Sequence, residues 1–176
     1  MDSNFVQAIK DTINDALTDV HTAMPATIKS FDAGTGLALV APAGKFKTAD
    51  GRSLDYPVIT GVPVVFQYSP TPGTGILFPV KAGDNCLLVI AEQTLDAWLY
   101  EGESAADLKH DLTNAIAIPG LYQKPPAKIA KACADNAVVV YAGETAVVVS
   151  KGGVAITGNV TITGNLTTSG GTVRLN

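Results

Sequence analysis

The chain has 176 residues, a formal net charge of −4, and 16% charged against 47% hydrophobic residues. This length allows one domain of ordinary size with appendages. So low a charge indicates that the folded chain hides more surface than a soluble monomer would. The body of the chain is acidic, which argues against nucleic-acid binding, because that draws much of its affinity from neutralising phosphates.

Residues 1–24 are expected to form an N-terminal helical segment. Apolar side chains recur at spacings of three and four over residues 3–22, and Pro25 prevents continuation: Phe5, Ile9, Ile13, Ala16 or Leu17, and Val20. This stripe either packs on its own domain or meets a partner, which could be two further copies of itself. The stretch after Met1 is acidic and amphipathic, so we expect no signal peptide and synthesis in a cytoplasm.

Residues 25–121 are expected to form a small closed β-barrel, with the OB-fold as the leading candidate. The segments 27–31 and 37–40 suggest a hairpin, and 56–66 an edge or bent strand because it contains two prolines. Residues 67–75 are rich in proline and glycine and predict a loop. Further strands are predicted at 76–80, 86–91 and 115–118, with a short helix at 93–99 that carries Trp98 into the end of the barrel.

Residues 122–136 suggest a linker, and residues 137–176 a second β region that ends in a short repeat. Two apolar runs, 137–141 and 146–149, lead into a stretch where glycine returns at 152, 158, 164 and 170. Strand-like alternation from 154 to 168 places apolar side chains on one side and Thr or Asn on the other. A fixed short period of this kind indicates a stacked or wound β architecture.

The repeat cannot be stable as one copy. Its few apolar side chains would contribute roughly 1.5–3 kcal/mol each, against an ordering cost of about 1–2 kcal/mol for every residue. Either more coils must stack on it, or copies from other chains must complete its core; several copies wound around a common axis would do so. The residues predicted to fill the core of a trimer are Val154, Ile156, Val160, Ile162 and Leu166.

The sequence contains few residues that could form a catalytic or metal-binding site. The two histidines, His21 and His110, have no second ligand at metal-binding spacing, and Cys86 and Cys133 suit reduced, unremarkable thiols. A triad built from Ser104, His110 and Asp111 is disfavoured, because no nucleophile elbow is present. We predict no catalytic, cofactor-binding or metal-binding residues, and no enzymatic activity.

Several short motifs together resemble the Gp138-type N-terminal domain of phage baseplate spikes. They are Gly61 to Val64, Phe78 to Asp84, Leu87 to Ile90, Asp96 to Trp98, Lys109 to Leu112, and Ala115 to Ile118 followed by Pro119, Gly120 and Leu121. The resemblance implies an OB-fold followed by an intertwined triple-stranded β-helix. It also implies a homotrimeric central spike beneath the baseplate hub, at the tip of a contractile tail, that pierces the host outer envelope when the sheath contracts.

The resemblance also sets the expected partners and location. The partners are the baseplate hub protein, the host outer membrane in passing and, through the N-terminal helix, a tail-tube or tape-measure protein; no nucleic acid and no cofactor is expected. Related spikes often end in a His-x-His motif that binds iron, whereas no histidine follows His110 here. Either a separate tip protein is expected to cap the needle, or packing alone reinforces its end. The expected location is the virion.

Two other classes stay open at this stage. The glycine-spaced repeat could belong to a hexapeptide-repeat acyltransferase, although that fold needs more coils and generally a histidine within or beside them. The barrel could be an OB-fold module for a ligand or nucleic acid, although such a module would present basic and aromatic residues on its face.

Overall fold

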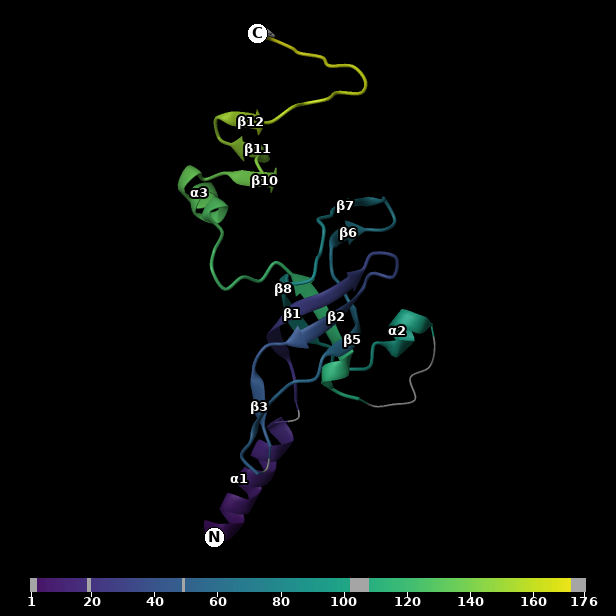
Figure 1. Cartoon of the computed structure of the whole chain (residues 1–176), viewed down its shortest axis with the longest axis vertical. Coiled ribbons are helices and arrows are strands. Elements are labelled where there is room, and N and C mark those ends of the chain that lie inside the picture. Colours follow the sequence, from purple (N-terminus) through teal and green to yellow (C-terminus); the bar gives the residue numbers. More distant parts are fainter. Residues whose placement is uncertain (1–2, 19, 49, 102–107, 172–176) are drawn as a thin grey trace. The chain divides into compact units, whose positions relative to one another are not determined.

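The computed structural model describes residues 3–18, 20–48, 50–101 and 108–171 (Figure 1). The chain separates into two compact units, Met1–Tyr122 and Gln123–Asn176. The first unit contains an N-terminal helix and most of the strands, and the second contains one helix and three strands. The chain is thus mainly β with an N-terminal helix, as predicted.

The first unit begins with helix α1 (Ser3–Thr18) and continues into strands and short helices. The helix is shorter than the predicted 3–22, because strand β1 starts already at Ala23, where it pairs with Val89. The remaining elements of this unit are β1 (Ala23–Asp32), β2 (Leu37–Pro42), β3 (Lys45–Lys47), β4 (Ser53–Asp55), β5 (Ile59–Pro63), β6 (Gln67–Ser69), β7 (Thr74–Ile76), β8 (Asn85–Ile90), α2 (Asp96–Tyr100), the 3-10 turn η1 (Leu112–Asn114) and β9 (Ala115–Pro119).

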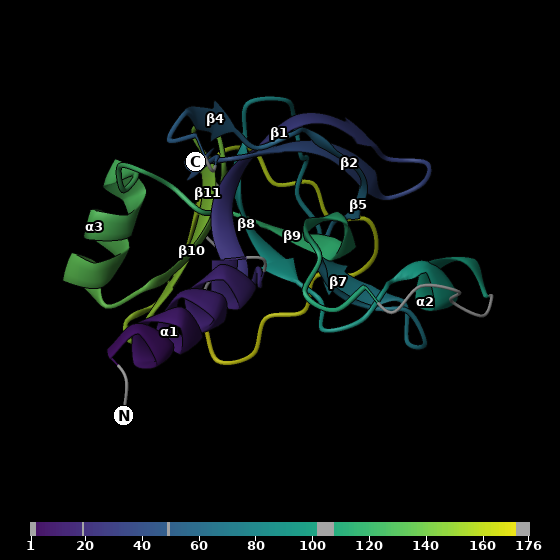
Figure 2. The ribbon, with the colours of Figure 1, turned by 90° about the horizontal axis from the view of Figure 1, so that it is seen from below.

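Five of these strands form one curled antiparallel sheet in the order β5-β2-β1-β8-β9 (Figure 2). Its two outer strands approach each other, because Val64 forms a parallel bridge with Ala117 and the Val65 N–H donates to the Ala117 carbonyl at 2.9 Å. A bulge between Ile28 and Ser30 interrupts the pairing of β1 with β2, and such bulges increase strand twist. The sheet therefore bends toward a closed cylinder.

The inside of this sheet is the hydrophobic core of the unit. Along β8, every second residue is buried, which is the period of a strand with one face inward. Ile28, Val40 and Leu88 are completely inaccessible to solvent. The full core consists of Ala26, Ile28, Ala38, Val40, Ile59, Val62, Val80, Cys86, Leu88, Ile90, Ala115 and Ala117.

Three predictions for the first unit were wrong. Residues 67–75, expected as a loop, include strand β6 and most of β7, since Pro70 and Pro72 lie in the tip of the hairpin where no ladder N–H is needed. Of the strand expected at 76–80, only Ile76 is in a strand. Trp98 lies on α2 with 74% of its surface exposed, so it does not enter the barrel; the aromatic rings packed together near the core are Phe31, Phe66 and Phe78.

The second unit consists of helix α3 (Ala127–Asp135) and an antiparallel sheet of β10 (Val138–Ala142), β11 (Thr145–Ser150) and β12 (Gly153–Thr157). Helix α3 lies inside the predicted linker. Its sequence consists mostly of good helix formers, and it ends where Asn136 adopts a left-handed conformation whose N–H donates to the Ala132 and Cys133 carbonyls. The predicted alternating strand continues only to Thr157, and residues 158–171 contain no strand.

Candidate functional site

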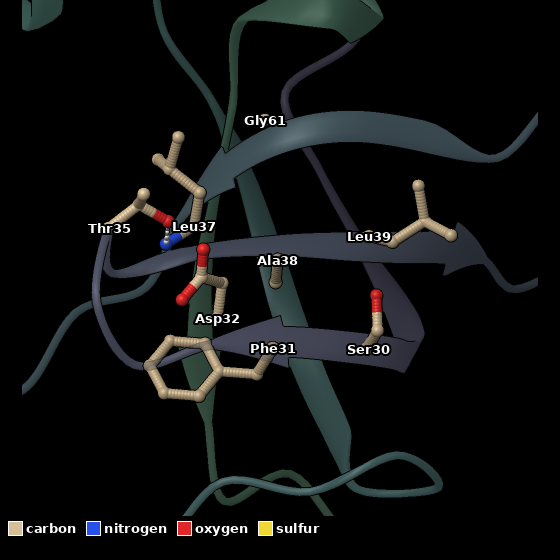
Figure 3. A pocket seen from close by; sticks show the side chains of 8 residues that line it. All are labelled: Ser30, Phe31, Asp32, Thr35, Leu37, Ala38, Leu39 and Gly61. Atoms are coloured by element: carbon tan, nitrogen blue, oxygen red, sulfur yellow. Dashed lines mark hydrogen bonds between the residues drawn. The ribbon is translucent and has the colours of Figure 1, made fainter.

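A hollow lies beside the turn that joins β1 to β2 (Figure 3). The side chains of Asp32 and Thr35 in this hollow form hydrogen bonds within the turn. The Gly34 N–H donates to Asp32 Oδ1 at 2.8 Å, and the Leu37 N–H donates to Thr35 Oγ1 at 3.4 Å. The Gly34 N–H and then the Thr35 hydroxyl hold the pKa of Asp32 below its usual value, which keeps it an acceptor. These groups build the hairpin and do not form an acid–base pair.

The two histidines are distant in sequence, and a backbone hydrogen bond joins them. The His21 N–H donates to the His110 carbonyl at 3.2 Å, and the His21 ring stacks edge-on against Tyr56. Asp111 is occupied by Thr113, whose hydroxyl and N–H lower the pKa of the carboxyl. Ser104, the third member of the disfavoured triad, lies outside the described residues. These contacts fix the segment before β9 and place no nucleophile beside a base.

The sheet of the second unit has one face that carries six valine and isoleucine side chains, with Ala142 and Thr145 as its next pair. Directly opposite residues of an antiparallel ladder share a face. The ladder aligns Val138 with Val149 and Val154, and the next row of this face aligns Val140 with Val147 and Ile156. We call these six residues the valine face. Five of them expose between 46% and 66% of their surface, so in one chain this face is largely bare.

Helix α3 lies over part of the opposite face of the same sheet, beside β10. The Lys128 ammonium lies 4.0 Å from the centre of the Tyr141 ring and donates to the Gly143 carbonyl at 2.6 Å. Val139 and Val148, which point to this side, are half-buried. Because α3 lies over part of this side and nothing in the chain lies over the valine face within the described residues, the valine face is the larger bare apolar surface of the sheet.

The five residues predicted to form the trimer core lie in two parts of the second unit. Val154 and Ile156 lie on β12 and join the valine face. Val160, Ile162 and Leu166 follow β12, where the single chain has no strand, and each is more than half exposed. The sequence reasoning missed Val138, Val140, Val147 and Val149; the alternate positions of the two valine runs that precede the repeat were the signal for them.

The glycines of the repeat share a backbone conformation. Gly158 and Gly164, six residues apart, have φ angles of 115° and 121°, which side chains other than glycine rarely adopt. The sequence repeat therefore has a structural counterpart in two similar bends. A bend every six residues is what a chain winding around an axis requires.

The match to a protein family falls on the first unit. Residues 24–120, more than half of the chain, match the family model described as the phage protein Gp138 N-terminal domain. The chain belongs to this family. The resemblance drawn from the sequence is thereby confirmed, and the protein carries a domain of phage proteins. No curated protein matches the chain closely enough to provide a further relative.

Within the Gp138 domain, the motif from Phe78 to Asp84 ends in a turn that is bonded to β1. The Lys81 N–H donates to Asp84 Oδ2 at 2.8 Å, and Gly83 has a φ of 97° that suits glycine. The Gly83 N–H donates to the Ile28 carbonyl and the Ile28 N–H to the Asp84 carbonyl, both at 2.8 Å. The turn thus satisfies backbone groups of β1 at the edge of its bulge.

A second motif of the Gp138 domain holds the long excursion between β8 and β9. Asn114 is buried, and its side-chain amide donates to the Leu108 carbonyl at 3.0 Å. Its own carbonyl accepts from the Ala91 N–H at 2.9 Å, so it joins both ends of the excursion. Among the described residues, no group of three or more His, Cys, Asp or Glu side chains is placed to hold a metal ion. The same residues include no helix that is both long and apolar enough to cross a membrane.

The second unit, which the family match does not reach, has no core of its own. Between residues 123 and 171 every side chain is exposed or only partly buried. A three-stranded sheet needs a packed apolar face to be stable in water. The candidate functional site of this protein is therefore an interaction surface, the valine face and its continuation into the repeat.

Proposed function

We propose that this protein is the homotrimeric central spike of a contractile phage tail, attached beneath the baseplate hub and driven through the host outer envelope on sheath contraction. The family match supports a structural protein of a phage. The observation that carries the trimer is the valine face, which is largely bare in one chain, whereas α3 lies over part of its reverse side.

The first unit suits an OB-fold barrel. The sheet order β5-β2-β1-β8-β9, joined by the parallel bridge between Val64 and Ala117, gives a circuit of five strands. Five strands in a partly open Greek-key barrel are the definition of that fold. In the proposed spike, three such barrels form the platform that seats the trimer under the hub.

The second unit suits the start of a triple-stranded β-helix. Three valine faces turned toward a common axis would bury eighteen branched side chains, at roughly 1.5–3 kcal/mol for each fully buried one. Continuing past Thr157, the strands of three chains could supply one another with the hydrogen bonds that residues 158–171 lack in one chain. Val160, Ile162 and Leu166 would then line the axis, with Thr and Asn outside.

Such a shaft suits a mechanical load. Its backbone hydrogen bonds would run between chains, so fraying must break many contacts together, and resistance to force depends on the height of the unfolding barrier. Residues 152–171 contain no charged side chain, which would reduce the cost of passing through a membrane. The partners proposed from the sequence are retained: the hub, a separate tip protein, and transiently the host outer membrane. The site of action is the baseplate tip of the virion.

The proposed role is not enzymatic, and the alternatives fit less well. In a hexapeptide-repeat acyltransferase a histidine would lie beside the coils, whereas the last histidine here, His110, belongs to the first unit. For an OB-fold binder of nucleic acid, residues 25–120 would be basic, and they are net acidic.

Sedimentation velocity of the full chain tests the proposal. The expected species is a trimer, and the Ile162→Asp variant is expected to lose it, because three carboxylates would meet on a dry axis. Thr161→Asp, one residue away on the outer side, is the matched control and should remain trimeric. A monomeric native chain, or an Ile162→Asp variant that is trimeric with unchanged melting, would refute the arrangement.

A further inference from the structure

Helix α1 carries a second bare apolar surface. Its apolar side chains are Phe5, Val6, Ile9, Ile13, Ala16 and Leu17, which we call the isoleucine stripe. All six are exposed in the single chain, Phe5 by 58% and Leu17 by 63%. A helix of 16 residues is about 24 Å long and marginal in water by itself. The helix therefore needs a partner along this stripe.

The polar side of α1 is already satisfied by local hydrogen bonds. Gln7 Nε2 donates to Asp11 Oδ1 at 2.8 Å, and the hydroxyls of Thr12 and Thr18 donate to carbonyls one turn earlier. These bonds leave the polar side no need for a partner. The isoleucine stripe is apolar and exposed, so water cannot take the place of a packing partner there as it does for the exposed polar side chains.

The spacing of the stripe follows a heptad. Val6, Ile9, Ile13 and Ala16 are separated by three, four and three residues, which places Val6 and Ile13 at position a, and Ile9 and Ala16 at position d. Phe5 and Leu17 flank this seam at positions g and e. With apolar residues also at g and e, the apolar surface of the helix is wider than the a and d positions alone, which form the seam of a coiled-coil dimer. Branched residues at a, with isoleucine and no leucine at d, favour bundles of more than two helices.

We propose that α1 forms a parallel three-stranded coiled coil with the α1 helices of two other copies of this chain. In that register Lys10, at position e, lies opposite Phe5 of the neighbouring helix, and its aliphatic stem can cover that ring. Thr12 lies opposite Leu17, so no like charges face each other across the seam over Ser3–Thr18.

This inference rests on the proposed trimer, which brings three α1 helices together in one particle. Tethering raises the effective concentration of the helices to about the millimolar range for short connections. A seam too short to associate from free chains can therefore form within the trimer. The coiled coil would then be formed by the N-terminal segment of each chain, and the β-helix by the C-terminal segment.

Cysteine cross-linking in the full chain tests the arrangement. Exposed Cys133 is first replaced by serine, and Cys86 is buried in the barrel core. In this background Ile9→Cys places three thiols on the proposed axis, close enough for a disulfide. After mild oxidation, two chains of each trimer should run as a covalent dimer on a non-reducing denaturing gel. Gln7→Cys, on the outer side of the same helix at position b, is the matched control and should stay monomeric.

Sedimentation of the same samples separates the possible outcomes. A trimer in which Ile9→Cys cross-links and Gln7→Cys does not supports the coiled coil. A trimer in which Ile9→Cys does not cross-link, or both variants do so equally, overturns it while the spike proposal stands; the stripe would then belong on its own barrel or on the hub. A monomeric chain overturns both proposals.

Discussion

The barrel and the β10–β12 sheet are both antiparallel and rich in branched residues, but only the barrel has an interior. Ile28 and Leu88 in the barrel are sealed from solvent, whereas Val140 and Ile156 in the second sheet are at least half exposed. The difference lies in curvature. The barrel sheet curls until β5 and β9 meet, so its apolar face closes on itself, and the second sheet has too few strands to do so. One region has a closed core within a single chain, and the other has none among its described residues.

Separating the two units should have the largest effect. A fragment of residues 1–122 is expected to melt cooperatively as one folded species, because its core is complete within the fragment. A fragment of residues 123–176 is expected to lack cooperative melting at low concentration and to gain structure only as it associates. Circular dichroism over a range of concentrations measures both; a second fragment that melts cooperatively as a monomer would contradict the comparison.

Truncating one buried and one bare side chain gives the next largest effect. Leu88→Ala should lower the free energy of unfolding of the barrel by about 2–5 kcal/mol, because it leaves a cavity in a closed core. Val140→Ala should leave the barrel transition unchanged and lower the stability of the trimer alone. Thermal melts and sedimentation of both variants distinguish these effects. Equal shifts of the barrel transition in the two variants would show that the units do not fold independently.

Chemical labelling of the two cysteines is expected to have the smallest effect on the protein. Cys86 is buried in the barrel, and desolvation raises the pKa of its thiol to about 11, so it should not react with a thiol reagent at neutral pH. Cys133 lies exposed on α3 and should react in the native protein. Mass spectrometry is expected to find one modified cysteine in the native chain and two after denaturation. Rapid native labelling of Cys86 would mean that the barrel opens readily.

The raised pKa of Cys86 also predicts how the stability of the barrel changes with pH. The unfolded thiol loses its proton near its ordinary value, whereas the buried thiol keeps it up to about 11. The stability due to this group is therefore complete below the ordinary value. It falls as the pH rises through the interval between the two values.

Much of the organisation follows from sequence patterns alone. The period of two in residues 86–90 places Cys86, Leu88 and Ile90 on one face, and that face is the core. The spacing of Phe5, Ile9 and Ile13 predicts a helix, and α1 contains them. The six-residue return of glycine predicts a wound β architecture; Gly158 and Gly164 share a backbone conformation, but the predicted strand ends at Thr157. Each of these patterns is local, so neighbouring residues carry the whole signal.

Other features depend on pairings that no local pattern reveals. The valine face exists because three strands align Val149 with both Val138 and Val154, and a shift of one residue would scatter these side chains over two faces. Trp98 was expected at the end of the barrel, and it lies outside it on α2 with 74% of its surface exposed. The meeting of His21 with His110 likewise follows from the path of the backbone.

The sequence by itself determined that α1 is helical, that β1, β2, β8 and β9 are extended, and which side of β8 is apolar. These properties follow from side-chain period and burial energy, which are features of short stretches of chain. Only the tertiary structure decided that the barrel closes over its core and that α3 lies over part of one side of the second sheet, leaving the valine face largely bare. Closure and coverage depend on strand register between distant segments, and register is fixed only when the whole unit folds.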